Sequence, residues 1–267
     1  MAHCLIALGS NVGDRAAQLR QATGELANLS ATRLIARSPL HETPPIGGPT
    51  GQGPFLNAAA LISTSLSPAE LLAGLRRIET GLGRVRNERW AARSLDLDVL
   101  LYDGVVLLSP ELEVPHPRMA FRRFVLEPAA EIAPWTIHPV SGWTVGALLQ
   151  HLNSGAEQIA VAAEDKATAD GLASQIAERL NLRFTPADSA TGDQPFISRW
   201  LADERGMHRA RPKLLLAVAA AGSDTAEMRR MLHLPQTGPV AWIAPDSAEA
   251  LHDAVAAVQS VWPALAD

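Results

Sequence analysis

The sequence lacks several features that mark whole classes of protein. Its single cysteine, Cys4, excludes an intrachain disulfide framework and a cysteine-rich zinc site, and we expect a small buried side chain there. No apolar run reaches about 18 residues, so we expect no membrane span. The N-terminus MAHCLIALGSN has no basic leader, so we expect no signal peptide and a cytoplasmic protein.

Positive charge is also scarce, and it is unevenly spread. The net charge of −5 and the pI near 5.9 argue against a nucleic acid or an acidic membrane as partner. Residues 1–153 have no lysine, and their 13 arginines balance 13 acidic residues, whereas residues 154–267 have 10 basic and 15 acidic residues. A chain of 267 residues allows two modest domains. We place the boundary at the turn residues Asn153-Ser154-Gly155.

The first part, 1–153, alternates strand and helix patterns. Apolar runs predict strands over 3–8, 32–38, 55–63 and 95–102, and 105–108 is expected to return as a hairpin. Helical spacing predicts helices over 14–29, 67–80 and 143–152. Residues 122–126 start a further strand or helix. The segment Ser67-Pro68-Ala69-Glu70 is a capping box. The prolines and glycines of 40–53 predict a loop. The pattern favours an α+β fold whose helices cover one face of a sheet.

The second part, 154–267, predicts a small parallel α/β domain. Strands are expected over 158–163, 181–184, 213–219 and 240–244, and helices over 169–180, 225–232 and 247–262. The turn AAEDKATADGLA stands where a phosphate loop would begin a nucleotide kinase, but it has no Gly-Lys-Ser/Thr. This part is therefore either a degenerate nucleoside-kinase-like domain or an accessory packing domain.

An aspartate pair is the first candidate site. Asp96 and Asp98 are two apart on a predicted strand, so both point to one face while Leu97 faces the core. Adjacent carboxylates repel, and a divalent cation with oxygen ligands, Mg²⁺ above all, relieves that repulsion. The alternative is a solvated strand face.

An arginine-rich loop leads directly into that pair. Ten residues, 84–93, hold four arginines: Arg84, Arg86, Arg89 and Arg93. Guanidinium forks bind phosphate oxygens, so the loop and the aspartates together suit a nucleoside triphosphate with Mg²⁺. The alternative is that the arginines only neutralise nearby carboxylates. Trp90 either stacks on a ring or packs the loop.

Two further segments complete the candidate site. The rigid loop Thr43-Pro44-Pro45-Ile46 can present backbone groups to a flat heterocycle, and Phe55 and Asn57 share one strand face beyond it. An aromatic platform beside an amide suits a pterin or purine edge, although Phe55 alone reads equally as core. The prolines around His116 stiffen the segment that precedes Arg122 and Phe124.

Together these motifs resemble the family of 6-hydroxymethyl-7,8-dihydropterin pyrophosphokinases of folate biosynthesis. The resemblance rests on ALGSNVGDR at 7–15, ETPPIG at 42–47, FLNAA at 55–59, IETGLGRVRNERWAARSLDLDVLLYDG at 78–104, VPHPRM at 114–119, RRFVLEPAAEIAP at 122–134 and HPV at 138–140. It implies a ferredoxin-like, three-layer α+β core. It also implies transfer of the β,γ-pyrophosphoryl unit of ATP to the pterin 6-hydroxymethyl group, with release of AMP.

The resemblance also assigns roles by position. Asp96 and Asp98 match the ligands of two Mg²⁺ ions, and Arg84 and Arg93 match mobile phosphate-binding arginines. The substrate-binding positions are Thr43, Pro45, Ile46, Phe55, Asn57 and Phe124, where the two phenylalanines would sandwich the pterin. The nucleotide-binding positions are Glu79, Arg84, Arg86, Arg89, Trp90, Arg93, His116 and Arg122. Asp98 is the candidate for easing removal of the hydroxyl proton.

One departure bears on rate. The family usually has Trp-Gly-Pro-Arg before its aspartate pair, whereas this chain has Trp90-Ala91-Ala92-Arg93, which changes the allowed backbone angles of the loop. A non-catalytic pterin- or nucleotide-binding protein therefore stays open as an alternative, as does a nucleoside kinase in the second part. The sequence does not predict the oligomeric state or the order of binding.

Overall fold

The chain forms two compact units. The computed structural model describes residues 1–47, 51–84, 93–185, 194–200, 211–220, 222–245, 247 and 249–266. Its units are Met1–Leu149 and Gln150–Leu265. The division falls inside helix α4, Val145–Ser154, whereas the boundary expected from the sequence falls where this helix ends.

The first unit is built on an antiparallel sheet. Its main strands are β1 (Ala2–Ser10), β2 (Thr32–Arg37), β4 (Phe55–Thr64) and β5 (Asp96–Tyr102), in the order β2-β4-β1-β5. Helix α1, Arg15–Asn28, joins β1 to β2, and helix α2, Pro68–Gly81, joins β4 to β5. This β-α-β-β-α-β order is that of a ferredoxin-like fold, and the expected α+β class is confirmed.

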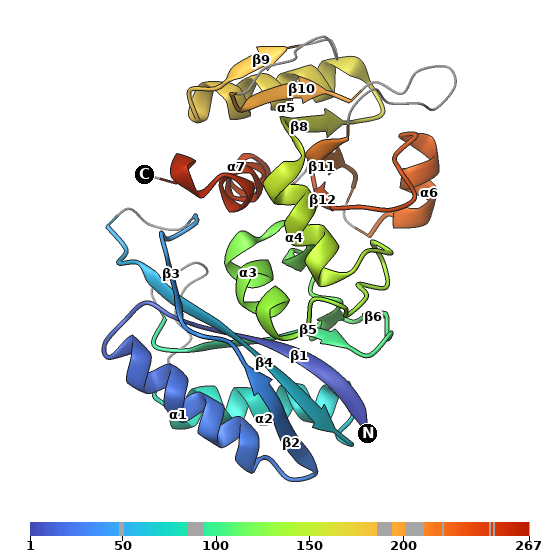
Figure 1. Cartoon of the computed structure of the whole chain (residues 1–267). Coiled ribbons are helices and arrows are strands. Elements are labelled where there is room, and N and C mark those ends of the chain that lie inside the picture. Colours follow the sequence, from blue (N-terminus) through green and yellow to red (C-terminus); the bar gives the residue numbers. More distant parts are fainter. Residues whose placement is uncertain are drawn as a thin grey trace. The chain divides into compact units, whose positions relative to one another are not determined.

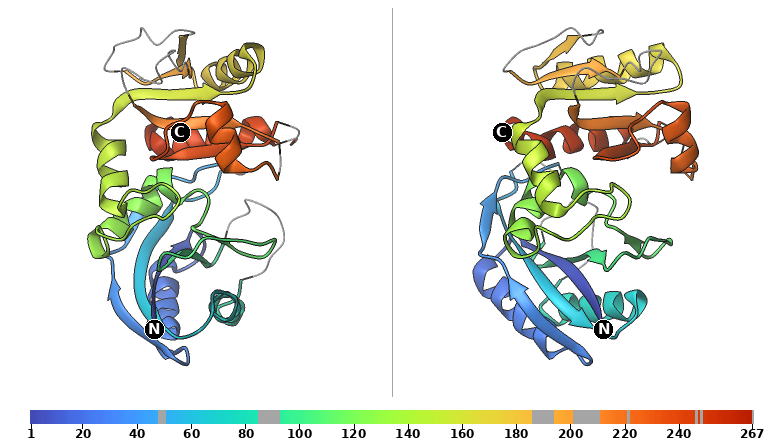
Figure 2. Two further views of the ribbon diagram at one scale, coloured as in Figure 1. Left: turned by 90° about the vertical axis from the view of Figure 1, so that its right-hand side faces the viewer. Right: turned by 45° about the vertical axis from the view of Figure 1, so that its right-hand side comes forward.

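Helices cover both faces of this sheet. Figures 1 and 2 show α1 and α2 together on one face, and α3, Arg123–Ile132, on the other. The three layers match the arrangement implied by the family resemblance. The expectation of helices on one face, drawn from the pattern alone, is wrong, because an amphipathic helix does not reveal which face of a sheet it covers.

Two short pairings also differ from the expectation. Strand β3, His41–Thr43, pairs with β4 inside the segment expected to be all loop. Strand β6, Leu107–Leu108, pairs with β7, Glu113–Val114, rather than returning along β5. A 3-10 turn, Met119–Phe121, then leads into α3. Such short strands depend on pairing with a neighbouring strand, which their own residue pattern does not identify.

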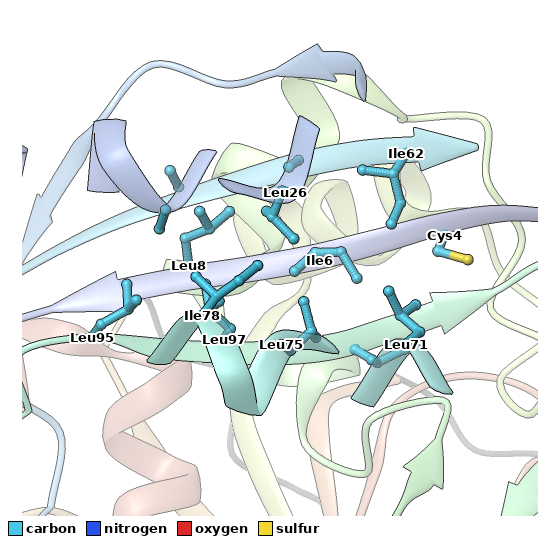
Figure 3. Packing of buried hydrophobic residues seen from close by; sticks show 14 of the residues in the cluster. Cys4, Ile6, Leu8, Leu26, Ile62, Leu71, Leu75, Ile78, Leu95 and Leu97 are labelled. Carbon is cyan, nitrogen blue, oxygen red and sulfur yellow. The ribbon is translucent and has the colours of Figure 1, made fainter. Parts of the chain in front are cut away.

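The core lies between the sheet and α1 and α2, and it orients the site. Figure 3 shows Cys4, Ile6 and Leu8 of β1 packed with Leu71 and Leu75 of α2. Cys4 is fully buried, as expected, and burial raises the pKa of its thiol to about 12. Because side chains alternate along a strand, the residues of β1 that lie next to these core residues in sequence point to the opposite face of the sheet.

The second unit contains a parallel sheet. Its strands are β8 (Ala156–Ala162), β9 (Arg183–Thr185), β10 (Phe196–Arg199), β11 (Pro212–Val218) and β12 (Val240–Ile243), in the order β12-β11-β8-β10-β9. Its helices are α5 (Lys166–Arg179), α6 (Thr225–Met231) and α7 (Ala250–Val261), followed by a 3-10 turn, Pro263–Leu265. The sequence patterns missed β10.

The turn between β8 and α5 is too short for a phosphate loop. Only residues 163–165 join the two elements, whereas a phosphate loop of the Gly-x-x-x-x-Gly-Lys-Ser/Thr type needs about eight. The Asp165 carboxylate instead caps α5, accepting hydrogen bonds from the Thr168 amide at 2.8 Å and the Thr168 hydroxyl at 2.6 Å. No helix in the described ranges is long and apolar enough to cross a membrane.

Candidate active site

A cavity of about 360 Å³ opens on the sheet face that carries α3, and the described residues that line it belong to the first unit. Strands β1, β4 and β5 form its floor with the side chains that point away from the core. The sequence-predicted residues at its wall are Thr43, Ile46, Phe55, Asn57, Arg93, Asp96, Asp98, His116, Arg122 and Phe124. Segments far apart in the chain therefore meet in one place.

The aspartate pair is oriented as its spacing predicts. Leu97 is buried in the core, while the side chains of Asp96 and Asp98 are 21% and 45% exposed toward the cavity. Between them, the Leu97 amide donates a hydrogen bond to Glu79 Oε1 at 2.8 Å. Glu79 is itself buried on α2, so its carboxylate fixes β5 from behind rather than lining the cavity.

Two arginines hold Asp96. Arg84 Nη1 lies 2.6 Å from Asp96 Oδ1 and also pairs with Glu79, and Arg93 Nη1 lies 2.5 Å from Asp96 Oδ2. Arg84 is only 12% exposed. Both arginines thus form ion pairs with carboxylates of the site. Arg86, Arg89, Trp90, Ala91 and Ala92 lie outside the described residues.

Asp98 is the less compensated carboxylate. Desolvation by the surrounding protein, followed by the charge of Asp96, raises the pKa of Asp98 to about 7. A divalent cation would relieve this repulsion, so the pair fits Mg²⁺. Within the ranges the structure describes, no third histidine, cysteine or carboxylate joins them as a ligand cluster. The remaining ligands would therefore be phosphate and water oxygens.

Beside Asp98 lies an uncharged histidine between cations. Burial, then the charges of Arg122 and Arg118, lowers the pKa of His116 to about 3. His116 Nδ1 accepts a hydrogen bond from the Arg118 amide at 3.1 Å, and its Nε2 lies 3.9 Å from Asp98. Burial and the Arg118 charge lower the pKa of Arg122 to about 10. This corner of the cavity is consequently suited to an anion.

The other half of the cavity is flat and amide-lined. Phe55 and Asn57 project from β4, and the Asn57 amide donates to Thr43 Oγ1 at 2.8 Å. Phe124 lines the same cavity, with the Arg122 guanidinium 5.3 Å from its ring centroid. Gly9 forms the floor, since a Cβ there would lie 3.2 Å from Asn57 Oδ1. Pro44 lines the wall rather than the predicted Pro45.

Sequence reasoning missed two residues here. Arg118 lines the cavity, although its motif had drawn attention only to its neighbours. The Asn11 side-chain amide donates to Gln52 Oε1 at 2.9 Å, and its Oδ1 accepts from the Arg93 backbone amide at 2.7 Å. An asparagine that follows a strand at its carboxyl edge was the available signal for this bridge.

Comparisons with known proteins agree on one family. The model of the 7,8-dihydro-6-hydroxymethylpterin-pyrophosphokinase (HPPK) family matches residues 5–134. A protein of Methylorubrum extorquens named 2-amino-4-hydroxy-6-hydroxymethyldihydropteridine pyrophosphokinase is 44% identical over 160 residues, which cover 60% of this chain and 99% of that protein. A Bacillus subtilis protein of the same name is 49% identical over 127 residues, covering 48% of this chain and 75% of that protein.

A solved structure of Plasmodium falciparum HPPK-DHPS aligns with 91% of this chain and 70% of that chain, at 11% identity and a TM-score of 0.45. That likeness is too weak to add to the argument. The sequence relationships are decisive, because nearly the whole of the Methylorubrum extorquens protein is matched. The chain belongs to the 7,8-dihydro-6-hydroxymethylpterin-pyrophosphokinase family.

Proposed function

We propose that the chain transfers pyrophosphate from ATP to the 6-hydroxymethyl group of 6-hydroxymethyl-7,8-dihydropterin and releases AMP, a step of folate biosynthesis. The single observation that carries this function is the division of one cavity into two halves. One half is aromatic and amide-lined, and the other holds two carboxylates among arginines. The function is also that of the family to which the chain belongs.

The aromatic half suits the pterin. Phe55 and Phe124 offer ring faces for stacking, and the Asn57 amide offers a donor and an acceptor to the heterocycle edge. Thr43 and Ile46 would supply backbone groups beside them, and Pro45, which does not line the cavity, is assigned there from sequence. The hydrogen bond from Asn57 to Thr43 fixes the spacing between the loop and the strand.

The charged half suits the triphosphate. Asp96 and Asp98 would hold Mg²⁺, two ions in our proposal, and the metal would neutralise phosphate charge and align the phosphorus under attack. Arg84 and Arg93 would exchange their ion pairs with Asp96 for phosphate oxygens. His116 and Arg122 would contact the nucleotide and its phosphates from the opposite wall, and Arg86, Arg89 and Trp90 are assigned there from sequence.

The reaction needs positioning and charge neutralisation more than a strong base. The hydroxymethyl oxygen bonds to the β-phosphorus, the bond between that phosphorus and the α–β bridging oxygen breaks, and AMP leaves with the electron pair. Asp98 would ease loss of the hydroxyl proton by helping to hold the cation beside it, because a nearby cation favours the deprotonated oxygen. His116, with a pKa of about 3, is too weak a base.

The nucleotide product tests the proposal. The protein is mixed with Mg²⁺, ATP and 6-hydroxymethyl-7,8-dihydropterin, and nucleotides are separated by chromatography. We expect pterin-dependent AMP from the wild type and at least a ~1,000-fold lower rate from Asp96→Asn/Asp98→Asn. Formation of ADP would contradict the proposal and favour a kinase in the second part. Pterin binding without any nucleotide product would favour a non-catalytic binding protein.

For the second part, residues 154–267, we propose an accessory α/β domain without phosphate transfer, with a degenerate nucleoside-kinase-like domain as the alternative. The parallel sheet supports the likeness to a nucleotide-binding fold. The three-residue turn and the Asp165 cap argue against a triphosphate at that turn.

A further inference from the structure

The pterin half of the cavity depends on a very short strand. β3 has three residues, His41–Thr43, and within the described part of the chain it pairs with the start of β4 alone (Figure 1). Thr43 lies opposite Phe55 in this pairing, and His41 lies opposite Asn57. Three residues give too few ladder hydrogen bonds to be stable alone, so side chains must hold β3 in place.

On the face that carries α1, an arginine contacts both β3 and the residue just before β4, where the loop between these strands begins and ends. Glu42 lies opposite Leu56, which packs on the core, so the Glu42 carboxylate is on the α1 side. Arg15, the first residue of α1, places Nη2 2.9 Å from Glu42 Oε2 and donates from Nη1 to the Pro54 carbonyl at 2.6 Å. The two acceptors directly adjoin Thr43 and Phe55 in sequence.

On the opposite face, α3 holds the same strand. His41 Nε2 lies 3.2 Å from Glu131 Oε2. The side chains of Glu42 and His41 thus fasten successive residues of β3 to helices on the two sides of the sheet. The Arg15 contact is the more specific one, because a planar fork spans two acceptors at once with two different nitrogens.

We infer that Arg15 is a positioning residue for the pterin, a clamp on Glu42 and Pro54 that sets pterin affinity without touching the pterin or the nucleotide. The inference rests on the proposed function. Arg15 does not line the cavity, and the aspartates and arginines of the triphosphate half lie on other segments. Small displacements of Thr43 and Phe55 would loosen stacking and hydrogen bonding, and such misplacement lowers binding steeply.

The test compares Arg15→Ala, Arg15→Lys and a control, Arg20→Ala, which removes an exposed arginine from the same helix. Binding of 6-hydroxymethyl-7,8-dihydropterin is titrated by calorimetry with a non-hydrolysable ATP analogue present, and the analogue is titrated separately. We expect Arg15→Ala to weaken pterin binding roughly tenfold, with analogue binding unchanged. Arg15→Lys should lie between, because one ammonium cannot span both acceptors in the fork geometry, and Arg20→Ala should match the wild type.

Equal weakening of both ligands, or no weakening of the pterin, would overturn the inference, and a matching loss with Arg20→Ala would do the same. Thermal melting of each variant excludes unfolding as the cause. AMP formation by the wild type separates this inference from the proposed function. Pterin binding without AMP would contradict the function alone, whereas a wild type that binds no pterin would contradict both.

Discussion

Gly9 shows how a single missing side chain shapes the cavity. It lies on β1 beneath the pterin half, where a Cβ would approach Asn57 Oδ1 to 3.2 Å. We predict that Gly9→Ala displaces the Asn57 amide and raises the KM for the pterin about tenfold, with little change in the KM for ATP. Steady-state kinetics with each substrate varied in turn measures both values.

Gly24→Ala is the matched control, because nothing lies within 4 Å of a Cβ at that position. It sits inside α1, where alanine is favoured over glycine by up to about 1 kcal/mol. This variant should keep both KM values and melt slightly higher. An unchanged pterin KM in Gly9→Ala would contradict the placement of Asn57.

Asp98 gives the residue-scale prediction on pH. The pKa of Asp98 in the folded protein, about 7, is above that of an ordinary carboxyl. Its contribution to the free energy of unfolding is therefore fully present below about pH 4 and is lost as the pH rises through about 7. In metal-free protein at pH 8, Asp98→Asn should therefore be stabilised by about 1 kcal/mol, a value discounted for solvent screening.

The pH dependence separates this cause from a general packing effect. Thermal melting in a chelator should show the advantage of Asp98→Asn at pH 8 and its disappearance near pH 4. An equal advantage at both pH values would mean that the charge of Asp98 is not its source. Saturating Mg²⁺ should remove the advantage at pH 8, because the metal compensates the wild-type carboxylate.

At the scale of residues, the sequence predicted side-chain directions well within strands, where side chains alternate between the two faces of the sheet. Asp96 with Asp98, and Phe55 with Asn57, share a face because alternation is local geometry. Patterns did not assign Asn11 or Arg15, because their partners lie on distant segments. Glu79 was assigned to the nucleotide, yet its buried carboxylate contacts Arg84 and the Leu97 amide.

At the scale of elements, the start of α2 was readable because its signal is local. The capping box is present, with Ser67 Oγ accepting from the Glu70 amide at 3.3 Å and Glu70 Oε2 accepting from the Ser67 amide at 2.7 Å. We predict that Ser67→Ala destabilises the first unit by about 1 kcal/mol. Urea unfolding measures this loss, and the KM for the pterin should not change, since neither Ser67 nor Glu70 lines the cavity.

A changed pterin KM in Ser67→Ala would show that the start of α2 affects the site.

In contrast to α2, β3 and β10 were not predicted. β3 lies among prolines and glycines that favour a loop, and its extended form depends on pairing with β4. The face covered by α3 was likewise set by packing rather than by its own sequence.

At the scale of the whole molecule, the cavity-lining residues that the structure describes all lie in the first unit. The matched Methylorubrum extorquens protein corresponds to 160 residues of this chain. We therefore predict that a chain ending at Ser154, which keeps α4 whole, retains pterin-dependent AMP formation with kcat/KM within about threefold of the full chain. A folded but inactive truncated chain, judged by circular dichroism, would show that the second unit contributes to the reaction.

The order of strands in the second unit was beyond the sequence patterns. They indicated a parallel α/β domain, and the pairs are parallel. The order β12-β11-β8-β10-β9 depends on which strands pair at long range, and no motif of the chain encodes that choice. In the first unit, by comparison, the family motifs predicted both the α+β fold and several residues that line the cavity.

The most direct test of the account is the mass of the pterin product after turnover with Mg²⁺ and ATP. Attack at the β-phosphorus predicts a pterin that has gained a pyrophosphoryl group, with both its phosphorus atoms from the β and γ positions of ATP. The Asp96→Asn/Asp98→Asn protein should yield none. A pterin that has gained a single phosphoryl group, or an unchanged pterin beside consumed ATP, would contradict the account.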